Sequence, residues 1–164
     1  QRHFPAINWL NSYSLYPQSL DQWFRDNIAA DFPEVRTEIS SLLQVEAELQ
    51  EIVQLVGSDA LPIDQQLTLE VARMTREYFL QQNAFHPVDT YSTLKLQYAM
   101  TKAILTFQEE SKKAIAAGAL LEDVVNVPAR TTLMRARLEE GYLERMEELV
   151  GDMCSEIQAT AEAV

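Results

Sequence analysis

Four aromatic rings, a histidine and a proline gather in the short segment EYFLQQNAFHPVDTY, residues 77–91. Phe85 and Tyr91 flank Pro87, where the chain is extended or turning and side chains need not enter a helical core. Two rings held a few ångströms apart can form a slot for a flat partner such as a purine base, with about 1–3 kcal/mol for each stacking contact. The alternative is that these loop aromatics only plug the end of a helical bundle.

Other chemistry has little support among the 164 residues. None of the 4 glycines precedes the Gly-Lys-Ser/Thr sequence of a phosphate-binding loop. His3 and His86 both fall outside the expected helices, and Cys154 has no neighbouring histidine or basic residue, so neither a metal site nor a thiol nucleophile is expected. Adjacent glutamates such as Glu109 and Glu110 diverge on a helix and indicate a solvated face. These residues do not assemble an active site by themselves.

The elements that position the aromatic segment follow from helical periodicity. Apolar residues recur at spacings of three and four from Val35 to Val56, and Gly57 can end that helix in a left-handed conformation. After the short connection SDALP a second run continues to Tyr78. Such a short connection makes the two helices pack antiparallel, as a hairpin around residues 35–83.

Further helices are expected on both sides of the hairpin. Ser19 followed by Gln22 is typical of a capping box at the start of the first helix, and Asp31 is a possible N-cap of the next. A third periodic run ends at Gly118, and Pro128 opens a last helix. Its single apolar stripe contains Met134, Leu138, Tyr142, Met146, Leu149, Met153 and Ile157. Alternating strand patterns are absent, so the fold class is all-α: a bundle of five or six helices, with Tyr78 and Phe79 in its core.

Charge and composition narrow the possible partners. The net charge of −12 and the pI of about 4.5 argue against nucleic-acid binding; Arg130, Arg135 and Arg137 come closest to a basic patch, but Glu139 and Glu140 follow them. No apolar run approaches the roughly 20 residues that span a bilayer, so direct membrane insertion is not expected. The single cysteine is consistent with a reducing cytoplasm.

Three segments carry a family resemblance: RHFPAINWLNSYS (2–14), EIVQLVGSDALPIDQQLTLEVAR (51–73) and EYFLQQNAFHPVDTYSTLKLQYAMTKAILTF (77–107). Together they resemble the C-terminal helical domain of the catalytic A subunit, or alpha chain, of V-type and A-type rotary ATPases. The likeness is specific as far as Phe107 and looser to the end. It implies that residues 1–16 are a linker or a remnant of a preceding nucleotide-binding domain, and that residues 17–164 are the C-terminal bundle.

The resemblance also implies a nucleotide role. In this family, aromatic side chains of the C-terminal domain close over the adenine of ATP or ADP while the preceding domain holds the phosphates and Mg²⁺. The matching position along FLQQNAF is Phe85, with Tyr91 as the second aromatic and Gln82 and Asn83 as neighbours of the base or ribose. The whole subunit would couple ATP hydrolysis or synthesis to proton or sodium transport. Residues 1–164 alone would have no ATPase activity.

A second implied role concerns the turn of the helical hairpin. In rotary ATPases this tip faces the central rotor shaft, and the matching residues are Gly57, Ser58, Asp59, Ala60, Leu61, Pro62, Ile63 and Asp64. The related beta subunits have a strongly acidic tip, whereas only two carboxylates remain here, so steric contact should matter more than charge. Further implied partners are B subunits in an alternating hexamer, in a cytoplasmic head peripheral to the membrane. Two readings compete: an ordinary hairpin turn, and a stand-alone acidic interaction module without a nucleotide role.

Overall fold

The computed structural model describes residues 5–12 and 16–162. These residues form six helices of nine or more residues and a short α5: α1 (Pro17–Asn27), α2 (Phe32–Val56), α3 (Ile63–Met74), α4 (Leu94–Ala116), α5 (Leu121–Val125), α6 (Pro128–Ala136) and α7 (Tyr142–Glu162). A 3₁₀ turn, η1 (Ser58–Ala60), precedes α3, and a π-helix, η2 (Thr75–Leu80), follows it directly. The predicted all-α fold is confirmed.

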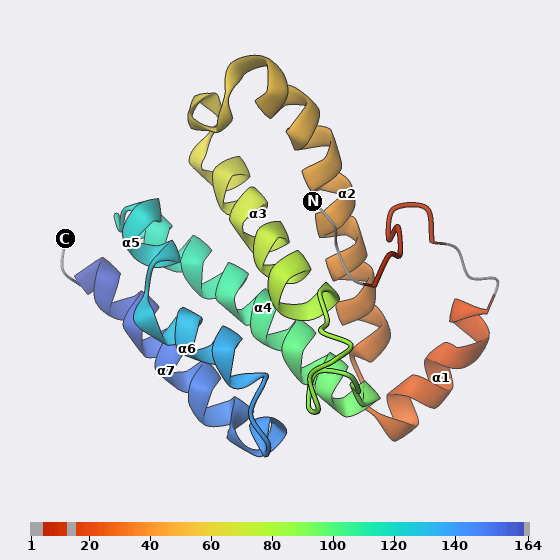
Figure 1. Cartoon of the computed structure of the whole chain (residues 1–164). Helices are drawn as coiled ribbons and strands as arrows, with labels where there is room; N and C mark the ends of the chain where they lie inside the picture. The colour runs from red at the N-terminus through yellow and green to blue at the C-terminus, as the bar shows by residue number, and fades with distance from the viewer. Residues whose placement is uncertain (1–4, 13–15, 163–164) are drawn as a thin grey trace.

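Helix α4 runs through the middle of the molecule, with the α2–α3 hairpin on one side and α6 and α7 on the other (Figure 1). The hairpin turn lies at one end of α3. The connection from η2 to α4, residues 81–93, lies at the opposite end. We call residues 57–64 the hairpin tip and residues 81–93 the aromatic loop. Because α3 and η2 form a rod of 18 residues, roughly 27 Å of helix separates these two segments.

A single hydrophobic cluster joins α2, α3, α4, α6 and α7, as the predicted spacing of apolar residues requires. Tyr78 is fully buried in it, and its ring meets the ring of Tyr142 edge-on, with 6.5 Å between centroids. The two hydroxyl groups are hydrogen-bonded to each other. Burial raises the pKa of Tyr142 to about 12 and also raises the pKa of Tyr78. Tyr78 is thus a core residue as predicted, and Phe79 is half-buried against the same cluster.

The starts of α1 and α2 differ in how far the sequence pattern holds. Helix α1 begins at Pro17, and the Ser19 hydroxyl donates to the Tyr16 carbonyl at 3.0 Å, so the predicted capping box is wrong. Asp31 is the N-cap residue of α2, but its carboxylate bonds to another helix. It accepts hydrogen bonds from Tyr98 Oη (2.7 Å) and Lys102 Nζ (2.6 Å) of α4, which lower the pKa of Asp31 and tie the start of α2 to α4.

The predicted single helix after Pro128 is also wrong, because the chain turns at residues 137–141 between α6 and α7. Gly141 adopts a φ of 73°, which glycine takes at little cost, and Leu138 from the predicted stripe is 39% exposed. The remainder of the stripe, from Tyr142 to Ile157, is buried. The three- and four-residue spacing continues across the turn, so the apolar pattern does not reveal it.

The segment before α1 is described only in part. Trp9 packs against the core cluster, whereas residues 1–4 and 13–15 of the predicted linker lie outside the described residues. In the part of the chain that the structure describes, no helix is both long enough and apolar enough to cross a bilayer.

Two glycines allow a test of the hairpin turn. Gly57 ends α2 at φ 84°, and an added methyl group there would meet no atom within 4 Å, as is also the case at Gly151 inside α7. We expect Gly57→Ala to lower the free energy of unfolding by about 1–3 kcal/mol through backbone strain alone. Gly151→Ala should raise it by up to about 1 kcal/mol through helix propensity. Urea unfolding of both variants measures this, and equal effects of one sign would contradict the assignment of strain to the turn.

Candidate functional site

The aromatic loop is closed by hydrogen bonds between its two ends. The Asn83 amide donates to Asp89 Oδ2 at 2.6 Å, and the Thr90 hydroxyl donates to the carbonyls of His86 (2.6 Å) and Ala84 (3.0 Å). His86 Nδ1 accepts from two backbone amides across the following turn, each at 3.3 Å. The loop therefore has a defined shape without a helix or strand of its own, as compact surface loops do.

Phe85 lies between those closing bonds, with its backbone amide donating to Asn83 Oδ1 at 3.0 Å. Its side chain is 98% exposed and that of Tyr91 is 81% exposed. An ordered backbone thus presents an unpacked ring to its surroundings. Covering such a ring would contribute about 1.5–3 kcal/mol, so the loop is suited to contact something outside this chain.

The structure brings the four predicted adenine residues onto one loop but not into one pocket. Gln82 and Tyr91 line a crevice of about 20 Å³, and Phe85 is not part of it. Among the ring pairs of the described residues, Phe85 and Tyr91 are not in contact. A preformed slot between those two rings is therefore absent from this structure, and a flat ligand would meet Phe85 on one side only. The other wall would have to come from elsewhere.

At the hairpin tip the predicted contact residues differ in exposure. Leu61 is 7% exposed, and its carbonyl accepts a hydrogen bond from Gln66 Nε2 at 2.8 Å, so this residue anchors the turn. Ile63 is 53% exposed, and just before the tip Leu55 is 85% exposed. The surface available to a partner is apolar with isolated carboxylates, which agrees with the predicted weakness of charge at this tip.

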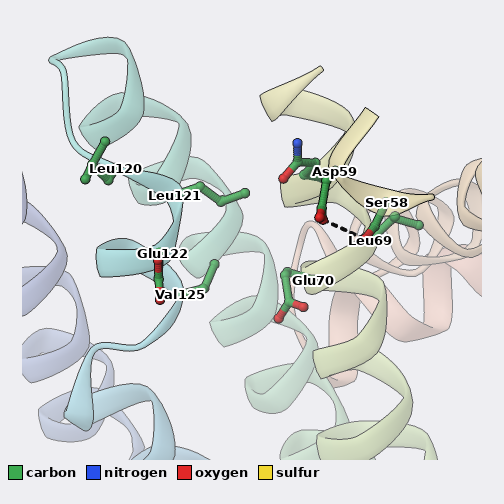
Figure 2. A pocket seen from close by; sticks show the side chains of 9 residues that line it. Ser58, Asp59, Leu69, Glu70, Leu120, Leu121, Glu122 and Val125 are labelled. Atoms are coloured by element: carbon green, nitrogen blue, oxygen red, sulfur yellow. Dashed lines mark hydrogen bonds between the residues drawn. The ribbon is translucent and has the colours of Figure 1, made fainter. Parts of the chain in front are cut away.

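A groove of about 530 Å³ opens beside the tip, between α3 and the start of α5 (Figure 2). Ser58 Oγ donates to Asp59 Oδ1 at 3.0 Å on one wall, and Leu120 on the other wall is 66% exposed. The residues that line the groove are Ser58, Asp59, Gln66, Leu69, Glu70, Leu120, Leu121, Glu122 and Val125. The groove widens the apolar and acidic surface at this end of the molecule.

One residue at the aromatic loop has no local sequence signal. Arg137 Nη1 donates to the carbonyls of Tyr78 (2.6 Å) and Gln81 (2.8 Å), where η2 ends and the loop begins. Its Nη2 lies 3.7 Å from Asp89 Oδ2. These partners are up to 59 residues away in the chain, so only a long-range comparison could have found them. The sequence marked Arg137 merely as part of a weak basic patch.

Fold and surface together define an all-α domain with a protruding helical hairpin at one end and an exposed, ordered aromatic loop at the other (Figure 1). Residues 21–125 match the family model of the C-terminal domain of V and A type ATP synthase. The chain belongs to this family.

Known relatives support the same assignment. Two of them are the catalytic A subunits of A-type ATP synthases: the chain is 51% identical over 156 residues to that of Methanosarcina barkeri, and 52% identical over 158 residues to that of Natronomonas pharaonis. It is 48% identical over 159 residues to the V-type ATP synthase alpha chain 1 of Clostridium tetani. These matches cover 95–96% of this chain, but the chain spans only 27% of the length of each relative. The similarity therefore continues well beyond Phe107 into α6 and α7.

The closing bonds of the aromatic loop can be tested with two threonines. Thr90→Val removes the hydroxyl bonds to His86 and Ala84, and should speed hydrogen exchange of the amides in residues 83–90 about 10-fold, since each hydrogen bond contributes about 1 kcal/mol. Thr68→Val is the matched control, because its hydroxyl bonds the Asp64 carbonyl within α3. Loop exchange that is the same in both variants would contradict the described closure.

Proposed function

We propose that this domain covers the adenine of ATP or ADP held by a preceding nucleotide-binding domain, and that its hairpin tip contacts a central rotor shaft. Phe85 stacks on the base, Tyr91 is the second aromatic, and Gln82 and Asn83 neighbour the base or ribose. Phosphates and Mg²⁺ are bound outside this chain, where they supply the chemistry of hydrolysis or synthesis. The domain thus serves a larger polypeptide that couples this reaction to ion transport and that alternates with B subunits in a cytoplasmic head.

The observation that carries the adenine role is the 98% exposed ring of Phe85 on a loop closed by its own hydrogen bonds. An exposed ring on a disordered segment would pay an ordering cost on stacking, whereas an ordered loop avoids most of that cost. A purine offers the flat surface that such a ring can cover. The absence of a second wall among the described residues agrees with a site completed by another domain.

The observation that supports coupling is the rod of α3 and η2, which joins the aromatic loop to the hairpin tip (Figure 1). Val71, Met74 and Tyr78 along this rod are fully buried against α4 and its neighbours, and tightly packed helices transmit displacement rather than deform. Movement of the loop toward a nucleotide would therefore carry the tip with it, in the manner of hinged domain closure.

The adenine contact is tested by Phe85→Ala in the full-length protein within its complex. Loss of one stacking contact should raise KM for ATP about 10-fold, with kcat at saturating ATP changed less than about twofold. Phe85→Tyr should keep KM near the original value, since it keeps the ring. Leu120→Ala, at an exposed leucine near the opposite end of the molecule, is the control. An unchanged KM in Phe85→Ala contradicts the proposal.

The rotor contact is tested separately by Ile63→Ser combined with Asp59→Asn at the exposed tip. We expect ATP hydrolysis to continue while the number of ions moved per ATP falls at least about twofold, because the tip would push the shaft through a smaller contact. Leu20→Ser, at an exposed leucine of α1, should leave this ratio unchanged. Coupling that is equal in the original enzyme and in both variants would rule out contact through these side chains.

A further inference from the structure

The aromatic loop begins where a π-helix ends, and that ending exposes backbone carbonyls. In η2 the Gln81 amide donates to the Arg76 carbonyl, and the carbonyls of Tyr78 and Gln81 are left to bond outside the helix. Carbonyl groups at a helix end need a donor from outside the helix. The single Nη1 of Arg137 supplies it to both, at 2.6 and 2.8 Å. The start of the loop is thereby fixed to the corner between α6 and α7.

The same guanidinium also reaches the other end of the loop. Its Nη2 lies 3.7 Å from Asp89 Oδ2, the oxygen that accepts the Asn83 amide at 2.6 Å. The side chains of Arg137 and Asp89 are only 14% and 10% exposed, so salt screens this ion pair less than it screens a surface pair. Gln81 and Asp89, on either side of Phe85, are thus held by one residue of a distant helix.

The turn at residues 137–141 explains why this residue is available. Arg137 is the C-cap residue of α6, the point at which the chain leaves the helical stripe. A planar guanidinium with five N–H groups can serve two carbonyls and a carboxylate together, whereas an ammonium group is a compact point charge. Its neighbour Arg135 is exposed on the same helix and makes no such contacts among the described residues.

We propose that Arg137 is the positioning residue of the aromatic loop, and that the α6–α7 corner determines how rigidly Phe85 is presented to an adenine ring. This inference rests on the proposed adenine contact. It gives the two C-terminal helices a role in nucleotide affinity, although neither carries a predicted adenine residue. Arg137 acts through the loop and does not touch the base.

The first test measures the loop without nucleotide. In the 164-residue chain, Arg137→Ala should speed exchange of the amide hydrogens in residues 81–90 about 10-fold. Arg137→Lys should give an intermediate rate, because it keeps the charge but not the fork of donors, and Arg135→Ala should leave the rate unchanged. Should Arg137→Ala fail to fold, Arg137→Gln retains an amide donor without the charge, and Asp89→Asn removes only the charge of the ion partner. Exchange in Arg137→Gln and Asp89→Asn that matches the original chain overturns the proposal.

The second test uses the full-length protein in its complex. Arg137→Ala should raise KM for ATP about 5-fold with kcat at saturating ATP nearly unchanged, and Arg137→Lys should recover part of that loss. In the Phe85→Ala background, Arg137→Ala should add little to KM, because the ring that it positions is already gone. An equal increase in KM with and without Phe85 overturns the positioning role. A normal KM in Phe85→Ala would instead refute the adenine contact, and the exchange data would still report on the tether.

Discussion

Tyr78 is fixed at both its side chain and its backbone, and the arrangement of the two functional ends depends on this. Its hydroxyl is paired with that of Tyr142 in the core, and its carbonyl accepts a hydrogen bond from Arg137. Buried hydroxyl and carbonyl groups are costly without partners, so the chain has little freedom in where η2 ends. That end sets the start of the aromatic loop. The same residue therefore joins the packed core to the exposed Phe85.

The rod of α3 and η2 gives this fixed point its mechanical meaning. At its other end Gly57 and the 3₁₀ turn reverse the chain into α2, with Leu61 buried to hold the turn. The exposed side chains on the tip and the exposed ring on the loop are thus carried by one rigid element, packed along α4. A π-helical segment next to a functional loop is a recurrent arrangement, because the changed register re-aims the residues that follow.

Local sequence patterns predicted the parts of this molecule that local forces determine. The spacing from Val35 to Val56, the stop at Gly57 and the loop character of residues around Pro87 are set by periodicity and backbone preference, and they hold in the structure. The turn before Tyr142 was missed because apolar spacing continues through it. The tie from Arg137 to the loop spans more than fifty residues, and no periodic pattern encodes such a contact. The missing slot between Phe85 and Tyr91 has a similar cause, since sequence spacing does not fix the distance between two loop rings.

The central claim is that the ring at position 85 stacks on adenine, and a fluorescent reporter at that position tests it most directly. Phe85→Trp in the assembled enzyme places an indole on the loop, and the signal of Trp9 and Trp23 can be subtracted using the unsubstituted enzyme. The account predicts that ATP quenches the additional emission and that tripolyphosphate, which lacks a base, does not. Emission that responds equally to both compounds, or to neither, would contradict it.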